Sequence, residues 1–308
     1  MEMKFFRNNK FYITLLLILL ISAAGLSVSN LDVLLRFYRS FQNGTLTMEK
    51  IRLDLASFDI GRKSSVTPIN VKTSEFDGML QVYVPEGEFL MGKEKVRKNA
   101  DSPQHLVYLD AFWMDKYEVS NAMYLKCIHA GGCTELVSDN SYYQNWVYRN
   151  HPVTYVTWDQ AGEYCQWAGR RLPTEAEWEK AARGMDGRLY PWGDEAPNPR
   201  LANFSGSMIH EAVSIYRYPL GASPYGALNM SGNVREWVAD WYDPGYYTTT
   251  PYMNPRGAEG GDERAMRSGS YNEDGREIAV TNRYRHEPQS AGLSRGFRCS
   301  EDGGAGNQ

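Results

Sequence analysis

The chain has 308 residues, of which 42% are hydrophobic and 23% are charged, and its formal net charge is −4. This balance is that of a globular protein with enough apolar residues for a sizeable core. It lacks the basic excess that nucleic-acid-binding proteins carry, so we expect no nucleic-acid partner. The 28 Gly, 14 Pro and 13% aromatic residues predict a fold rich in irregular structure that aromatic side chains hold together.

Residues 1–29 contain a predicted targeting segment. An uncharged apolar run at residues 11–26 follows three basic residues, Lys4, Arg7 and Lys10, which is the pattern of a signal anchor or a signal peptide. We expect an uncleaved single-pass anchor, with secretion after cleavage near Ala24 as the alternative. Because basic residues beside such a segment stay in the cytoplasm, the rest of the chain is predicted to lie outside the cytoplasmic membrane.

Residues 30–75 predict a helical stalk followed by a linker. Two amphipathic stretches, 31–41 and 48–58, are separated by Asn43 and Gly44, and the residues after them are polar. The main domain is predicted to span residues 76–301, and residues 302–308 are expected to form a disordered tail.

The main domain opens with strand patterns and continues with helices. Residues 80–92 predict a strand, a turn and a second strand, and a helix is expected from Asn121. Two further helices should follow, each with a capping box at its start and a glycine at its end. The capping and terminal residues are Thr157, Gln160 and Gly169 for one helix and Thr174, Glu177 and Gly184 for the next.

Four cysteines, an even number in a chain predicted to be exported, indicate disulfides. Four cysteines allow three connectivities. The pair Cys127–Cys133 would close the smallest loop, which leaves Cys165 to pair with Cys299. Structural zinc is the less favoured alternative, because the five histidines do not flank the cysteines at zinc-finger spacing.

Nine motifs between residues 79 and 300 occur in a recognisable order: PEGEFLMG, YEVSNAMY, HPVTYVTW, RRLPTEAEWEKAAR, YPWGDE, GNVREWVADWY, SGSY, RYR and GFRC. In this order they resemble the formylglycine-generating enzyme family, also called sulfatase-modifying factors. The resemblance implies an α+β domain with the C-type-lectin-like fold of that family, and it matches Cys165 and Cys299 to the family's structural disulfide. The predicted anchor and stalk lie outside the resemblance.

The resemblance implies a copper site that this chain lacks. Active members of the family oxidise a sulfatase cysteine to formylglycine with molecular oxygen, and they hold copper(I) between two soft cysteine thiolates. These cysteines belong between SGSY and RYR, where residues 272–282 contain none. Glu273 stands at the first position, and Thr281, in a lengthened loop, stands at the second. Because their oxygens are hard ligands, we expect neither copper nor catalysis by the family's mechanism.

The resemblance also implies calcium, which prefers carboxylate, amide and carbonyl oxygens. One calcium site of the family matches Asn229, Gly232, Val234 and Glu236. Part of a second, weaker site matches Asn203 and Phe204, and its other ligands are not recognisable. The alternative is a purely structural role, in which Asn229 and Glu236 only stabilise the loop that contains them.

A candidate binding groove is predicted from the motifs beside the missing cysteines: Ser270, Tyr271, Arg283 and Arg285. Arg283, Arg285 and Arg298 could contact an anionic ligand, but pairing with Asp or Glu is the favoured interpretation. Ser270 shows no base partner in the sequence, so a serine nucleophile is not expected. Trp237 and Trp241 are predicted to be core residues rather than a platform for a ligand.

Two hypotheses for the function follow from these patterns. The first is a non-catalytic, membrane-tethered member of the family that binds an extracytoplasmic protein, peptide or glycan through its lectin-like scaffold. The second is an oxidoreductase, either one that converts a sulfatase cysteine to formylglycine or one that uses a different metal. Sugar binding of the calcium-lectin kind is not favoured, because the Glu-Pro-Asn type of sugar motif is absent from the sequence.

Overall fold

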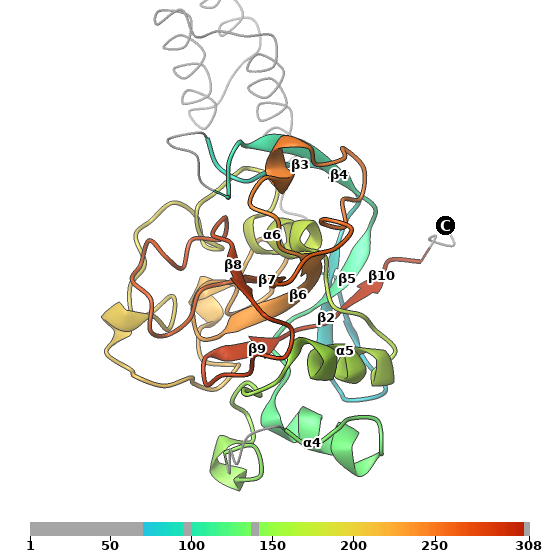
Figure 1. Cartoon of the computed structure of the whole chain (residues 1–308). Helices are drawn as coiled ribbons and strands as arrows, with labels where there is room; N and C mark the ends of the chain where they lie inside the picture. Colours follow the sequence, from blue (N-terminus) through green and yellow to red (C-terminus); the bar gives the residue numbers. More distant parts are fainter. Residues whose placement is uncertain (1–69, 95–99, 137–141, 305–308) are drawn as a thin grey trace, which may run out of the picture. The chain divides into compact units, whose positions relative to one another are not determined.

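The computed structural model describes residues 70–94, 100–136 and 142–304, whose arrangement Figure 1 shows. The chain divides after Lys63, and all described residues belong to the second unit. The predicted anchor at residues 1–29 and the predicted stalk up to residue 69 therefore lie outside the described residues. Within the described ranges, no helix is long and apolar enough to cross a membrane.

The strands of the described residues form three sheets. The first has the order β1 (Val71–Thr73), β2 (Leu80–Val84), β5 (Phe112–Asp115) and β10 (Ser300–Asp302), and all its pairs are antiparallel. The second pairs β3 (Gly87–Met91) with β4 (His105–Leu109). The third has the order β8 (Tyr284–His286), β7 (Arg264–Arg267), β6 (Arg235–Trp241) and β9 (Arg295–Phe297), in which only the β6–β9 pair is parallel.

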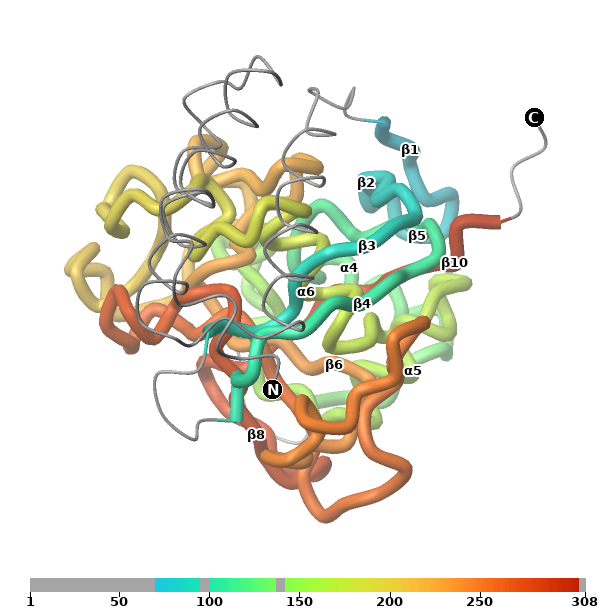
Figure 2. Tube along the Cα trace, turned by 90° about the horizontal axis from the view of Figure 1, so that it is seen from above, coloured from blue at the N-terminus to red at the C-terminus, as the bar shows by residue number. Residues whose placement is uncertain are grey.

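The strands at both ends of the domain correct two predicted boundaries. β1 pairs with β2, with Val71 opposite Val82, so the folded domain begins before residue 76. At the other end Asp302 belongs to β10, and Gly303 N donates to the carbonyl of Ala111 (2.9 Å), so the predicted tail begins too early. Strand pairing with partners far along the chain causes both differences. Figure 2 shows β10 beside β5 at this edge of the domain.

The predicted helices form where their capping signals place them. Among the described residues the helices are α4 (Asn121–His129), α5 (Trp158–Trp167) and α6 (Glu175–Arg183), with short 3-10 turns at Trp146–Tyr148, Ser205–Ser207, Pro219–Gly221 and Tyr246–Thr248. Thr157 and Thr174 cap α5 and α6 with complete capping boxes. β2 and β3, predicted as strand, turn and strand, belong to different sheets and do not pair with each other.

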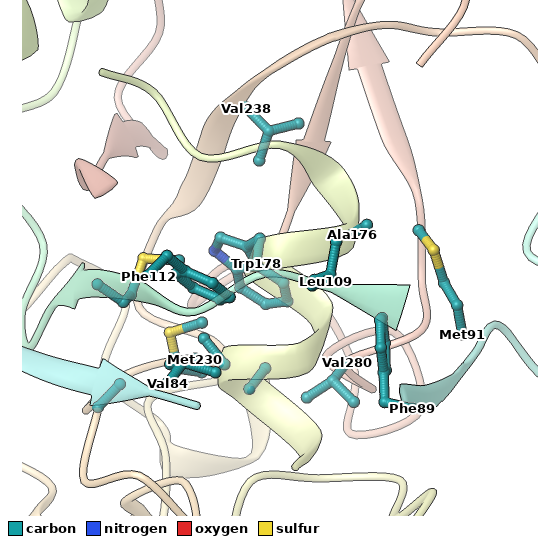
Figure 3. Packing of buried hydrophobic residues seen from close by; sticks show 14 of the residues in the cluster. Val84, Phe89, Met91, Leu109, Phe112, Ala176, Trp178, Met230, Val238 and Val280 are labelled. Carbon is teal, nitrogen blue, oxygen red and sulfur yellow. The ribbon is translucent and has the colours of Figure 1, made fainter. Parts of the chain in front are cut away.

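The main core surrounds α6, which lies between the β3–β4 pair and the third sheet (Figure 1). Trp178 of α6 is fully buried, and Figure 3 shows it among the apolar side chains of this cluster, including Leu109, Phe112 and Val238. A second core contains α5 and the other face of the third sheet. Trp237 is fully buried there, as predicted, whereas Trp241 stays partly exposed and stacks on the guanidinium of Arg264 at 3.5 Å.

The polar residues of α6 are buried as completely as its apolar ones, which its sequence pattern does not predict. Arg267 of β7 forms ion pairs with Glu175 (2.9 Å) and Glu179 (2.6 Å). Glu179 also pairs with Arg183 at 2.8 Å. These buried charges are tolerated because each has a partner of opposite sign with good hydrogen-bond geometry.

Both expected disulfides are present. Cys127–Cys133 joins the end of α4 to the following turn, with its Cα atoms 5.3 Å apart. Cys165–Cys299 joins α5 to the residue before β10, with its Cα atoms 5.6 Å apart. This second bridge links the C-terminal strand, β10, to α5, which belongs to the second core.

Candidate functional site

The segment between β7 and β8 carries the residues predicted for the site. Ser268 and Gly269 turn the chain out of β7 with left-handed backbone, at φ 85° and 73°. A Cβ on Gly269 would lie 2.9 Å from Ile278 Cγ2 and 3.0 Å from the carbonyl oxygen of Glu277. Only glycine therefore fits where the two arms of the segment meet.

Glu273, at the first position predicted for a copper cysteine, is held by protein groups on both oxygens. Its Oε2 accepts hydrogen bonds from Ser270 N (2.6 Å) and from Ser270 Oγ. Its Oε1 forms an ion pair with Arg235 of β6. Glu273 is thus the carboxylate partner of Ser270 that the sequence did not reveal. Because Ser270 is fully buried, its hydroxyl is not open to an incoming substrate.

Thr281, at the second copper position, is also an interior residue. It is 1% exposed, and within the described part of the chain its Oγ1 has no hydrogen-bond partner. Between the two positions the chain makes an exposed turn, in which Asp274 Oδ1 accepts from Arg276 N (2.7 Å) and the Asp274 carbonyl accepts from Glu277 N (3.0 Å). Asp274, Arg276 and Glu277 of this turn are exposed, whereas the residues that follow, Ile278 to Val280, are buried.

The cysteines of the chain leave no thiolate for a metal. All four form disulfides and none is free. Copper(I) is selected by soft thiolate ligands, whereas this segment offers a carboxylate and a buried hydroxyl. The residues present therefore do not fit a two-thiolate copper site.

The structure separates the four predicted groove residues. Ser270 and Tyr271 lie in the interior, at 0% and 2% exposure. Arg283 donates to both oxygens of Glu175, at 2.7 and 2.8 Å. Arg285 has a side chain that is 53% exposed and pairs with Glu263 at 3.2 Å. Pairing with acidic residues is therefore confirmed for both arginines, and the four residues do not form one open groove.

Two pockets lie at the surface of the described domain, one beside this segment and one away from it. One, of about 410 Å³, is lined in part by Lys93, Asp101, Asn282 and Tyr284 and lies beside the segment. A larger one, of about 730 Å³, is lined in part by Tyr83, Asp110, Arg171 and Asn254 and contains none of the predicted site residues. Pocket size alone would therefore direct attention away from the segment that the motifs indicate.

The carboxylate of Glu236, a predicted calcium ligand, has two protein partners. Arg298 donates to both of its oxygens at 2.7 Å, and Trp178 Nε1 donates to Oε2 at 2.7 Å. All three side chains are fully buried. This arrangement confirms the pairing expected for Arg298 and agrees with a structural role for Glu236.

Asn229 and Gly232 lie in a tight loop that is also closed by protein contacts. Asn229 has left-handed backbone, at φ 57°, and its Nδ2 donates to Ile215 O (3.0 Å). The Gly232 carbonyl accepts from Ser268 Oγ (3.0 Å), and a Cβ on Gly232 would lie 2.2 Å from the carbonyl oxygen of Asn203. The side chains of Val234 and Phe204 are buried. The two predicted calcium sets are thus neighbours in space, and calcium binding stays a prediction.

Glu118 is a buried acidic residue of this region that the sequence reasoning missed. Its oxygens accept from Asn229 Nδ2 (2.7 Å) and Asn233 Nδ2 (2.8 Å). Burial raises the pKa of Glu118 to about 7, although nearby Arg298 acts in the opposite direction. The glutamate stands in the motif YEVSNAMY, but only the fold brings it to a loop more than a hundred residues away.

Comparison with known proteins agrees with this architecture. A family model described as a sulfatase-modifying factor enzyme 1-like domain matches residues 68–302. The formylglycine-generating enzyme of Mus musculus is 32% identical over 281 residues, which covers 72% of this chain and 74% of that relative. A second Mus musculus protein, named inactive C-alpha-formylglycine-generating enzyme 2, is 36% identical over 168 residues and matches 50% of each chain.

A solved structure has the same fold. PvdO from Pseudomonas aeruginosa matches with a TM-score of 0.67 and 23% identity, over 77% of this chain and 99% of that one. A likeness at this identity concerns the fold alone. The mixed α and β architecture with much irregular backbone, expected from the motifs, is therefore confirmed for the main domain.

Proposed function

Because the chain belongs to the sulfatase-modifying factor family of formylglycine-generating enzymes, we propose that it is a non-catalytic member that binds a protein, peptide or glycan outside the cytoplasmic membrane. The observation that carries this proposal is that all four cysteines are in disulfides, so none is left as a copper(I) ligand. The ion pair of Glu273 with Arg235 stands where the family's mechanism needs a thiolate. The relative whose name calls it inactive supports the same reading.

The proposed location rests on the N-terminal pattern and on the disulfides. Disulfides persist in oxidising compartments and are rare in a reducing cytoplasm. The basic residues before the apolar run at residues 11–26 give an N-in, C-out topology. A phosphatase reporter fused to the C-terminus should therefore be active and a fluorescent reporter that folds only in the cytoplasm should be dark. The reverse pattern would contradict the proposed topology.

The second candidate function is formylglycine formation through an unrecognised ligand set. The similarity to the murine formylglycine-generating enzyme over most of the domain favours it. It would need a metal bound by oxygen or nitrogen ligands, because no cysteine of this chain is free. That requirement is the reason why we place it second.

The two functions are separated by a turnover assay. The full chain, purified in detergent, is supplied with copper(I), oxygen and a cysteine peptide of the sulfatase type, and aldehyde formation is followed by mass spectrometry. We expect no conversion, while an active formylglycine-generating enzyme run in parallel converts the peptide. Clear conversion by the unsubstituted chain would overturn the non-catalytic proposal.

We also propose calcium as a ligand of the loop at Asn229. Ca²⁺ that binds the native chain should raise its melting temperature in proportion to the logarithm of the ion concentration. Asn229→Ala should abolish this rise, whereas Asn198→Ala, in a half-buried turn outside this loop, should leave it unchanged. Equal melting temperatures with Ca²⁺ and with EDTA would contradict the proposed calcium binding.

A further inference from the structure

Strands of the third sheet bring two arginines to one face. Arg235 of β6 and Arg295 of β9 are Cα partners in the parallel pair, so their side chains point to the same side of the sheet. Figure 1 shows β8, β7, β6 and β9 in succession across this sheet. The two arginines are therefore neighbours although sixty residues separate them along the chain.

The register places two side chains of β8 on that same face. Trp237, two positions after Arg235, is the partner of Met266, and Met266 is the partner of Tyr284. Because side chains alternate along a strand with a period of two, Tyr284 and His286 share the face of Arg235. The guanidinium of Arg235 lies 4.2 Å from the ring centroid of Tyr284, so these side chains are in contact.

We call Arg235, Tyr284, His286 and Arg295 the cationic face, and all four side chains are half-buried and reach solvent. Arg235 has Glu273 as its ion-pair partner. Arg295 has no carboxylate partner within the described ranges, and its guanidinium donates only to neutral groups, Ser290 Oγ (2.6 Å) and Ala291 O (3.2 Å). Positive charge on this face is therefore incompletely balanced.

Mutual repulsion acts between these groups. Burial, followed by Arg295 and Arg235, lowers the pKa of His286, and Glu287 acts weakly in the other direction. Burial, followed by Arg235, lowers the pKa of Arg295. Because each positive charge disfavours its neighbour, an anion bound between them would be stabilised.

The chain itself shows which anion the face accepts. The carboxylate of Glu273, which belongs to a neighbouring loop, already forms an ion pair with the guanidinium of Arg235. Guanidinium groups pair with carboxylates through two parallel N–H donors, and Arg295 is the guanidinium of this face that no side-chain carboxylate of the described chain occupies.

We propose that the cationic face binds a carboxylate of an acidic peptide, with Arg295 as the principal contact and Arg235 and Tyr284 beside it. This inference rests on the proposed function, because it names the ligand class of the same non-catalytic domain. Its binding site is this half-buried group of side chains next to Glu273, on the face of the sheet whose residue Trp237 packs into the second core, rather than the buried positions of the missing cysteines.

The test measures binding without turnover. The full chain in detergent is titrated at low salt into a fluorescein-labelled hexaglutamate peptide, with a hexaglutamine peptide as the neutral reference. Arg295→Gln should weaken binding of the glutamate peptide about tenfold or more, the scale of one lost charge-assisted hydrogen bond. Arg200→Gln makes the same charge change at an exposed turn outside the face and should alter binding much less.

A second variant separates binding from misfolding. Glu273→Gln removes the carboxylate that competes for Arg235 but keeps an amide oxygen that accepts from Ser270, so it should tighten binding of the glutamate peptide severalfold. A misfolded protein would not gain affinity. Equal binding of the two peptides, equal effects of Arg295→Gln and Arg200→Gln, or stronger competition by inorganic phosphate or sulfate than by glutamate would overturn the inference.

The turnover assay and the binding assay can refute the proposed function and the inference separately. A chain that makes formylglycine and still binds the acidic peptide through Arg295 would refute the proposed function only. A chain without turnover and without peptide binding would refute the inference and leave the proposed function standing.

Discussion

The two disulfides close loops of very different length, and this difference predicts their contributions to stability. The sequence separation is 134 for Cys165–Cys299 and 6 for Cys127–Cys133. In the chain-entropy model, the restriction of the unfolded chain grows with the logarithm of the loop length, which gives about 5 kcal/mol for the long loop and about 2.2 kcal/mol for the short one. The difference of about 2.8 kcal/mol depends only on the ratio of the two loop lengths.

The assay compares two double variants in urea, followed by tryptophan fluorescence with linear extrapolation. Cys165→Ala with Cys299→Ala should lower the free energy of unfolding more than Cys127→Ala with Cys133→Ala. Cys165 and Cys299 are both fully buried, whereas only Cys127 of the short-loop pair is, so lost packing adds more to the cost of the first pair. An equal or larger loss for the short-loop pair would refute the reasoning from loop entropy.

Three further variants test the buried network, its titration and a helix cap. Arg298→Met should lower the free energy of unfolding by about 3–5 kcal/mol, because it leaves Glu236 buried without its cation; Arg276→Met, at an exposed pair, should be nearly neutral in the same urea titration. Burial raises the pKa of Asp240 to about 8, so the native state keeps a proton that the unfolded state releases near pH 4. Stability should therefore fall as the pH rises from about 4 to about 8, and Asp240→Asn should reduce this slope in urea titrations across that range; an unchanged slope would contradict the assignment. Thr174→Ala should cost about 1 kcal/mol, since it removes the hydroxyl that accepts from Glu177 N, and an unchanged melting temperature would show that the cap contributes nothing.

Local signals were sufficient to place the helices. A capping box links residues three positions apart, so the pairs Thr157–Gln160 and Thr174–Glu177 could be read from the chain and are found as predicted. The glycines after both helices have a positive φ, 72° for Gly169 and 69° for Gly184, which residues other than glycine rarely adopt. These features depend on short-range geometry, which the order of residues contains directly.

Contacts between distant residues were the part that could not be predicted. The pattern of α6 indicates an amphipathic helix, yet Glu179 and Lys180 are fully buried, because another layer covers the polar side of the helix. The carboxylate beside Ser270 was missed for a related reason: Glu273 could be recognised as a replaced cysteine, but not as the partner of Arg235. Sheet pairing likewise moved the start of the domain to β1.

The sequence by itself determined the family of this protein and the lack of cysteines between SGSY and RYR, since both follow from the identity and order of residues. The tertiary structure decided which side chains meet. Arg235, Tyr284, His286 and Arg295 share a face only because strands from three parts of the chain pair in one register, and a shift by one residue would turn each strand's side chains to the opposite face. That register depends on the packing of the whole domain, which no local pattern specifies.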